Sequence, residues 1–443
     1  MIEQLIIILV ILTLPVVAFI GKGGPVKPTE SVEVFTLGYR QFKSFRIAAG
    51  ISMSFVGGAA TLNMASLGYQ YGWSVLVDPI SVFTALIISA ALAPKIRAGN
   101  GLTLTDLLSS ASPTLKVMLG VITFIVYQLL TAAQFVAVQK LLSPYFPAIT
   151  PWLVVAFPAV AVFLYTYFRG LNSVTSTDVY QLLIMLALYV IPVLWVFAAD
   201  KSGVSRDMLP RSPIAPINLL IYLALPLLFV PVSYDTNIRI KAAASLFHAQ
   251  AGLILGGILY FLLVGISIGV GVYMHAIGKV VESPEKVLPF FFNTKLGDFS
   301  LLGTIAVLVA IVSTLDSFAF DTIVSASNDV LGPSRAKGLL SDRRVLALST
   351  LVVLVISFIV AFIFQQILGL ILAAMLLYVS TFIPIAIGRL LNVPDRWLVV
   401  TSSLTGIAII IAKAINYTPP LEPLAFLIFH LVLIAVNRIG GRK

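Results

Sequence analysis

Residues 299–331 read FSLLGTIAVLVAIVSTLDSFAFDTIVSASNDVL, and this stretch decides the class of the protein. It is long enough to cross a bilayer as a helix that rises about 1.5 Å per residue. The first half is apolar, whereas the second half carries many hydroxyls and carboxylates. Residues three or four apart share a helix face. The spacing therefore predicts one polar stripe, with Asp316 beside it, made of Ala310, Ser313, Thr314, Ser317, Asp321, Ser325 and Asn328.

The chemistry of this stripe points to a cation. Carboxylates at membrane depth are costly unless they are paired, wetted or bound to a cation. Hydroxyl and carboxylate oxygens are hard ligands that suit hard cations. The alternative is that the stripe only joins helices, because Ser and Thr do so routinely in membrane proteins.

The composition of the whole chain agrees with a membrane protein. Of 443 residues, 59% are hydrophobic and 10% are charged, and the mean hydropathy is +1.06. We therefore expect an all-α polytopic membrane protein. The absence of cysteine excludes disulfides and iron–sulfur clusters. The chain has no phosphate-binding GxxxxGK[ST] motif, which argues against ATP as the energy source. The net charge of +10 comes from basic loops, so we expect no nucleic-acid partner.

Thirteen hydrophobic runs are long enough to span a membrane. The first has an acidic start and no cleavage site, so we interpret it as a retained helix rather than a signal peptide. The runs fall at about residues 2–21, 44–72, 74–95, 114–141, 147–168, 172–199, 214–234, 247–275, 299–331, 345–364, 366–390, 396–415 and 421–438.

The basic residues predict the orientation. With the N-terminus outside, the inside loops hold 20 of the 28 Lys and Arg residues. Because Lys and Arg are enriched in cytoplasmic loops, the sequence predicts an outside N-terminus and a cytoplasmic C-terminus in a multi-pass protein of the plasma membrane.

Two of the runs are interrupted. Residues 45–73 read FRIAAGISMSFVGGAATLNMASLGYQYGW and contain several glycines, which permit a helix break or, alternatively, close helix packing. Residues 217–241 read INLLIYLALPLLFVPVSYDTNIRIK, where the two prolines predict a break or a plain kink. Interrupted helices five spans apart indicate an inverted repeat with a binding site at the breaks. We predict repeats at residues 44–199 and 214–390, with additional helices at 1–21 and 396–443.

Four segments resemble the sodium/solute symporter family, which includes sodium–proline, sodium–sugar, sodium–pantothenate and sodium–sialic acid symporters. They are SVEVFTLGYRQFKSF, VGGAATLNMASLGYQYGW, YFRGLNSVTSTDVYQLLI and AIVSTLDSFAFDTIVSASNDVL. The last two are the most specific. The resemblance implies a five-plus-five inverted-repeat core with broken first and sixth core helices. It also implies sodium-coupled symport by alternating access rather than an enzyme. The solute would be a small polar molecule of the amino acid, sugar, vitamin or monocarboxylate class, and the partners would be this solute and membrane lipid, without an obligatory protein partner.

The resemblance also implies ion sites. The principal sodium site would use main-chain carbonyls of the broken helix and groups on the polar stripe, namely Met53, Val56, Ala310, Ser313 and Thr314. A second sodium, which some members bind, would use Asp178, Ser313, Asp316 and Ser317. This chain departs from the family at Asp316, where those members have a hydroxyl. Asp178 has an alternative interpretation as a helix cap, because it follows Thr175, Ser176 and Thr177.

The resemblance implies that the solute lies between the two broken helices and the third and tenth core helices. Apart from Lys140, the sequence shows no cation deep in the core helices, which favours a neutral or zwitterionic solute. The polar residues expected at this site are Asn63, Tyr69, Gln70, Tyr127, Gln134, Tyr234 and Tyr378.

Three other functions remain to be weighed against sodium symport. A proton-coupled symporter would use Asp316 or Asp321, and Asp321, which lies outside the family's usual sodium ligands, is also a candidate proton or ion relay. A membrane sensor on the same fold would transport nothing, but the chain carries no soluble signalling domain. An intramembrane aspartyl enzyme needs two carboxylates that share a proton. Asp316 and Asp321 do not stack on one helix face, which argues against the enzyme.

Overall fold

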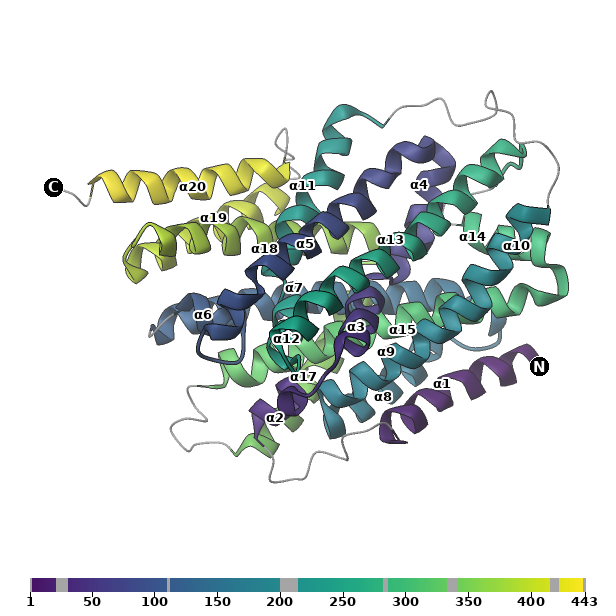
Figure 1. The fold of residues 1–443 in the computed structure, drawn as a ribbon, viewed down its shortest axis with the longest axis horizontal. Coiled ribbons are helices and arrows are strands. Elements are labelled where there is room, and N and C mark those ends of the chain that lie inside the picture. The colour runs from purple at the N-terminus through teal and green to yellow at the C-terminus, as the bar shows by residue number, and fades with distance from the viewer. Residues whose placement is uncertain are drawn as a thin grey trace.

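The computed structural model describes residues 2–20, 31–109, 112–199, 214–281, 286–332, 341–414 and 422–440. Within these ranges every regular element is a helix, and the one pair of bridged residues outside helices, Phe42 and Ala243, forms no strand. Most long helices run side by side across the molecule (Figure 1). Helix α1 (Ile2–Ile20) packs on α8 (Pro151–Arg169) at one flank, and α20 (Glu422–Gly440) packs on α18 (Ile367–Leu390) at the other.

A helix overlaps each of the thirteen predicted runs. The remaining long helices are α3 (Ser44–Phe55), α4 (Met64–Tyr71), α5 (Val77–Ala98), α7 (Pro113–Leu142), α9 (Leu171–Met185), α10 (Ile191–Ala199), α11 (Pro216–Val232), α13 (Leu246–Ala276), α15 (Ser300–Val324), α17 (Asp342–Ile363) and α19 (Asp395–Ala414). Short helices α2 (Val32–Leu37), α6 (Leu104–Ser109), α12 (Tyr234–Ala242) and α14 (Val287–Phe291) join or extend them. In the described ranges, nine helices are long and apolar enough to cross a membrane, or up to ten if one bent pair counts as a span. The count of thirteen crossings stays a prediction.

The polar helix α15 lies in the middle of the bundle. It packs against α3, α7, α8 and α9, and every residue from Gly303 to Val324 is buried. A π-helical turn, Ser325–Val330, continues it, and Ser325 to Asp329 are buried as well. The predicted polar stripe is therefore enclosed by protein rather than by lipid.

The first predicted break is confirmed. Helix α3 ends at Phe55, and the φ of −86° and ψ of 54° at Val56 are not helical. The chain then resumes through the π-helical segment Ala59–Asn63 into α4. A Cβ atom on Gly57 would lie 2.7 Å from both Thr314 Oγ1 and Gln134 Oε1. Glycine at this break thus allows side chains of α7 and α15 to lie close to the backbone between α3 and α4.

The second predicted break is also confirmed, but the prediction ended this span too early. Helix α11 ends at Val232, and α12 follows at an angle of 41°. Ser233, with a ψ of 142°, caps α12 by accepting a hydrogen bond from Thr236 N at 3.3 Å. The helical segment therefore continues to Ala242, beyond residue 234, where the predicted run ends.

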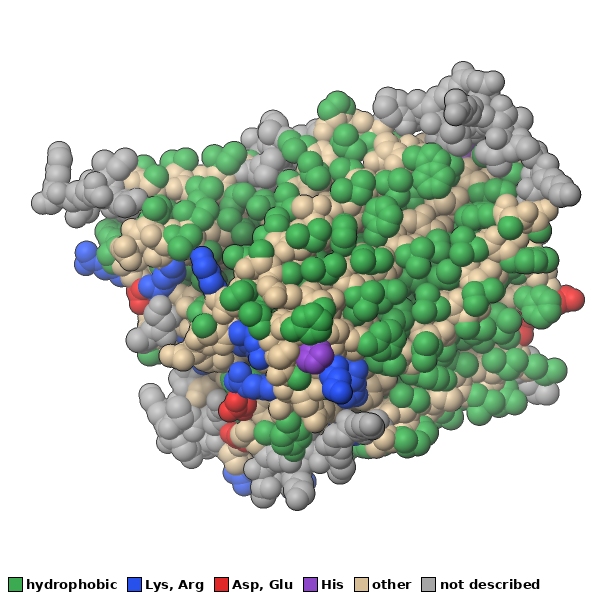
Figure 2. Space-filling view, in the orientation of Figure 1, with side chains coloured by type: hydrophobic (Ala, Val, Ile, Leu, Met, Phe, Trp, Pro, Cys, Tyr) green, Lys and Arg blue, Asp and Glu red, His purple; other side chains and the backbone are tan. Residues whose placement is uncertain are grey.

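Charged side chains gather at one end of the bundle. Figure 2 shows a face that is hydrophobic across its middle, with blue side chains near α2, α3, α6 and α12. Three basic residues that the orientation argument counted in inside loops are in fact buried in helices: Arg169 in α8, and Arg239 and Lys241 in α12. Other residues of that argument lie outside the described ranges: Lys22, Lys27, Lys201, Arg206, Arg211, Arg335, Lys337, Arg442 and Lys443.

Candidate functional site

The residues predicted for the principal sodium site meet where α15 passes the break after α3. Thr314 Oγ1 donates to Met53 O at 3.0 Å and lies 3.3 Å from Ala310 O. Met53 belongs to the last turn of α3, where the end of a helix leaves carbonyls without a helical donor. Met53, Val56, Ala310 and Ser313 are fully buried, and Thr314 is nearly so. The break and the polar stripe therefore bring backbone and hydroxyl oxygens together.

Ser313 links this group to α9. Its hydroxyl donates to Asp178 Oδ1 at 2.6 Å. Because a serine hydroxyl has a single proton, this bond leaves the lone pairs of Ser313 Oγ available to a cation. Asp178 itself is fully buried. It is the eighth residue of α9, which begins after Gly170, so the helix-cap interpretation of Asp178 is wrong.

A buried arginine that the sequence analysis missed lies beside Asp178. Arg239 Nη2 donates to Asp178 Oδ2 at 3.2 Å and to Ser317 Oγ at 3.1 Å. Its Nη1 forms an ion pair with Asp235 Oδ1. The expectation that the core helices hold no deep cation apart from Lys140 is therefore wrong. The spacing of Asp235 and Arg239, four residues apart in a polar segment after a proline break, is the sequence signal that could have revealed the pair.

The two acidic residues of α15 differ in their surroundings. Asp316 Oδ2 accepts hydrogen bonds from Tyr165 OH at 2.6 Å and Thr177 Oγ1 at 3.0 Å. Asp321 is fully buried, and neither of its carboxylate oxygens has a hydrogen-bond partner among the described residues. Asp316 is thus held by α8 and α9, whereas Asp321 keeps both oxygens available.

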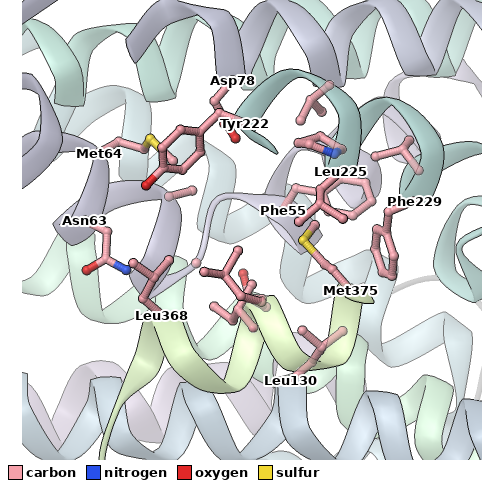
Figure 3. Close-up of a pocket in the computed structure, with 18 of the residues that line it drawn as sticks. Phe55, Asn63, Met64, Asp78, Leu130, Tyr222, Leu225, Phe229, Leu368 and Met375 are labelled. Atoms are coloured by element: carbon pink, nitrogen blue, oxygen red, sulfur yellow. The ribbon is translucent and has the colours of Figure 1, made fainter. Parts of the chain in front are cut away.

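A cavity with a volume of about 110 Å³ opens beside the first break. Its walls come from the α3–α4 break, α5, α7, α11, α13, α15 and α18. In Figure 3, apolar side chains gather at one end, and Asn63 and Asp78 lie toward the other. Thr314 belongs both to this wall and to the group around Met53. The cavity and the predicted sodium site are therefore neighbours.

The structure brings only two of the seven predicted solute residues to this cavity, Asn63 and Gln134. Gln134 Oε1 also accepts a hydrogen bond from Gly58 N at 3.1 Å, which satisfies a backbone donor freed by the break. The other five lie elsewhere. Tyr69 donates to Lys279 O, Gln70 to Ser66 and Tyr234 to Asp329, while Tyr127 accepts from Tyr234 N and Tyr378 stacks on Phe382.

Three polar residues of the cavity were not predicted: Asp78, Tyr222 and Tyr260. Tyr260 OH donates to Asp78 Oδ2 at 3.3 Å, and Tyr222 lies next to Asp78 in Figure 3. Asp78 is 7% exposed. It is the one acidic residue of the predicted run 74–95, and an ionisable residue inside a span is by itself a signal of a functional site.

Comparison with known proteins identifies the family of the chain. The family model "Sodium:solute symporter family" matches residues 35–256, which is half of the chain. The chain belongs to the sodium:solute symporter family. Its function is sodium-coupled secondary transport by alternating access, with sodium as the coupling ion, and it is not an enzyme. No curated protein sequence matches the chain.

Solved structures show the same fold at low sequence identity. A sodium-coupled sialic acid symporter in a substrate-bound outward-open state has a TM-score of 0.77 at 14% identity, over 99% of this chain and 96% of that one. Mhp1, a nucleobase-cation-symport-1 family transporter, closed around bromovinylhydantoin, has a TM-score of 0.59 at 16% identity, over 90% and 93%. Inward-facing Mhp1 has a TM-score of 0.53 at 16% identity, over 91% and 92%. At these identities the likeness concerns the fold alone.

Proposed function

We propose that the oxygens around Thr314 form the principal sodium site of this symporter. The ligands would be the carbonyls of Met53, Val56 and Ala310 and the hydroxyls of Ser313 and Thr314. The observation that carries the proposal is the hydrogen bond from Thr314 Oγ1 to Met53 O, which joins the broken helix to α15. A sodium ion at this junction would hold the two helices together, as alternating access requires of a coupling ion.

The solute would occupy the adjacent cavity. Among the described residues that line it, Asp78 is the charged one, and no Lys, Arg or His joins it. A carboxylate in such a place favours a solute with an ammonium or another strong hydrogen-bond donor. The rest of the wall is mainly apolar and includes Phe55, Leu130, Phe229 and Met375.

The position of Thr314 narrows the proposed class of solute. Because Thr314 lines the cavity and belongs to the proposed sodium site, an anionic group of the solute could face the ion while an amine faces Asp78. We therefore propose a zwitterionic solute of the amino acid class with an apolar side chain. Sugars, vitamins and monocarboxylates are the other classes to test.

A thermal-shift screen of the purified protein tests this proposal. Amino acids, sugars, vitamins and monocarboxylates are added with sodium and with choline in its place. A ligand at 100 times its Kd stabilises the folded protein by about 2.7 kcal/mol. We expect an apolar amino acid to raise the melting temperature in sodium only, and Asp78→Asn to weaken its binding by about tenfold or more.

The matched control is Glu33→Gln, which removes an exposed carboxylate that pairs with Arg40 far along the chain from the cavity. We expect it to bind the solute like the wild type. Stabilisation by a sugar or a monocarboxylate, but by no amine-bearing solute, would contradict the proposed solute class. Equal stabilisation in choline would contradict the sodium site.

We also propose the orientation of the chain in the membrane and its division into two repeats. The N-terminus would be outside and the C-terminus cytoplasmic, in the plasma membrane. Residues 44–199 and 214–390 would form the two inverted repeats, flanked by helices at 1–21 and 396–443. Support comes from the breaks at Val56 and Ser233, each of which falls near the start of its proposed repeat.

Asp321 is proposed as a relay for a proton or an ion. Support comes from its full burial without a described hydrogen-bond partner. If Asp321 carries a proton in the cycle, Asp321→Asn removes the pH dependence of solute uptake at fixed sodium. An unchanged pH dependence would leave sodium as the only coupled ion.

A further inference from the structure

The guanidinium of Arg239 is enclosed by side chains from three helices. It donates to Asp178 on α9 at 3.2 Å, to Ser317 on α15 at 3.1 Å and to Asp235 on its own helix α12. The side chains of Arg239, Asp178 and Asp235 have no exposed surface. Buried charges of this kind persist in proteins only when they are paired and hydrogen-bonded.

Two of these acceptors belong to the set that the family resemblance assigns to a second sodium ion. That set is Asp178, Ser313, Asp316 and Ser317. An oxygen that accepts a hydrogen bond from the guanidinium directs lone-pair density toward it. A sodium ion would need the same oxygens, and two positive charges at such a short distance repel strongly where water is excluded.

The backbone of the first broken helix leaves space for this side chain. A Cβ atom on Gly50 of α3 would lie 2.5 Å from Arg239 Nε. One helical turn later, Ser54 Oγ donates to Ser317 Oγ at 2.9 Å. The guanidinium therefore fits against α3 as well, and it connects both broken helices with α9 and α15.

We infer that Arg239 is a tethered cation that takes the place of a second sodium ion. The inference rests on the proposed principal sodium site, which it leaves unchanged. The chain then carries one sodium ion per transport cycle, at the site around Thr314. Asp178 positions Ser313 for that ion by accepting a hydrogen bond from its hydroxyl, while the other carboxylate oxygen of Asp178 is held by Arg239.

Direct titration of sodium binding to the purified protein, together with the steepness of sodium-dependent uptake, tests this inference. We expect one bound sodium ion and a Hill coefficient near one for the wild type. Arg239→Gln leaves Asp178 and Asp235 without their cation, so we expect a second bound sodium ion and a Hill coefficient that approaches two. The double variant Arg239→Gln/Asp178→Asn removes a carboxylate and is expected to bind one ion again.

Two single variants serve as matched controls. Lys241→Gln removes another buried cation from α12, one whose ammonium donates to Gly99 O and Gly101 O instead of to the acidic cluster. Arg239→Lys keeps the charge. Both are expected to bind one sodium ion.

Different results would contradict the inference and the proposed principal sodium site. Two sodium ions on the wild-type protein would overturn the inference, and this result does not depend on whether any variant folds. One ion on a folded Arg239→Gln protein would overturn it as well. A wild type whose sodium binding is absent, or is insensitive to Thr314→Ala, would instead overturn the proposed principal site.

Discussion

At the scale of single residues, Thr314 has the most exacting position in the molecule. Its hydroxyl reaches Met53 O, and its side chain faces Gly57, where a Cβ atom would clash with it. If this hydroxyl is a sodium ligand, Thr314→Ala removes one oxygen from a small shell. Because a hydrogen-bonding group at a charge contributes about 1.5 to 3 kcal/mol, we expect sodium half-saturation to rise by about tenfold or more. Sodium-dependent uptake in proteoliposomes measures this change.

Thr314→Ser is the matched control because it keeps the hydroxyl and removes only a methyl group. We expect its half-saturation to stay close to that of the wild type, and we expect the maximal flux of Thr314→Ala to change less than its sodium affinity. Equal half-saturation in the Ala and Ser variants would mean that the hydroxyl is not a ligand.

The residues of the stripe could be predicted from sequence, but Arg239 could not be predicted by the same reasoning. Helical spacing alone places Ser313, Thr314 and Ser317 on one face. The segment after Ser233 looked like a loop because it is polar and contains Asp235, Arg239 and Lys241. Its burial depends on partners from distant helices, such as Asp178 and Ser317, and hydropathy along one chain does not contain that information.

At the scale of elements, the existence of the helices and of both breaks follows from the sequence, whereas some boundaries do not. The polar run before Asp178 looked like a helix start. Instead, Thr175 and Ser176 lie inside α9 and donate to carbonyls four residues earlier. Thr177 also lies inside the helix, and its hydroxyl donates to Asp316. The helix begins after Gly170, which has a φ of +52° and where a Cβ atom would lie 2.3 Å from Phe35 O, so the position requires glycine. In the sequence alone, hydroxyl side chains that donate to carbonyls of their own helix cannot be distinguished from side chains that cap a helix start.

The short helix α6 lies outside the apolar spans and offers a test at this scale. Asp106 accepts hydrogen bonds from Leu102 N at 2.8 Å and Thr103 N at 3.1 Å and pairs with Lys116 at 2.6 Å. Burial, the largest single influence, raises the pKa of Asp106, but Lys116 and the two backbone donors together outweigh it and hold the pKa below its usual value. The folded state therefore favours the carboxylate.

The lowered pKa of Asp106 predicts how the stability of the protein changes with pH. The contribution of the carboxylate is complete above the unfolded-chain pKa of about 4 and is lost as the pH falls through the lower pKa of the folded protein. We expect Asp106→Asn to destabilise the protein at pH 7 by about 1 to 2 kcal/mol and the difference from wild type to shrink below about pH 4. Thermal melts across pH measure it.

The control for this prediction is Asp298→Asn, which removes an exposed carboxylate from the turn before α15. It should follow the wild-type curve at every pH. A difference between Asp106→Asn and wild type that persists unchanged at low pH would show that the amide disturbs α6 for a steric reason instead.

At the scale of the whole molecule, the distribution of basic residues and the number of membrane crossings must place each terminus on the same side of the membrane. The end of the bundle near α2, α3, α6 and α12 carries the basic side chains on the face in Figure 2. The thirteen predicted spans are an odd number, which places the two termini on opposite sides of the membrane. Hydropathy counts nine or ten strong spans among the described residues, and the interrupted and terminal helices account for the difference. An even number of crossings would place both termini on the same side.

Cysteine labelling decides between these arrangements, because the chain has no cysteine of its own and any introduced thiol is the sole target. We expect Gly440→Cys to react with an impermeant maleimide only after the cells are permeabilised, since basic residues favour the cytoplasmic side for the C-terminal end. Ile2→Cys at the start of α1 is the matched partner and should react in intact cells. If both thiols react in intact cells, the number of crossings is even. If Gly440→Cys alone reacts in intact cells, the number of crossings is odd but the orientation is reversed. The buried Arg169, Arg239 and Lys241 then have to be removed from the count of loop charges that predicted the orientation.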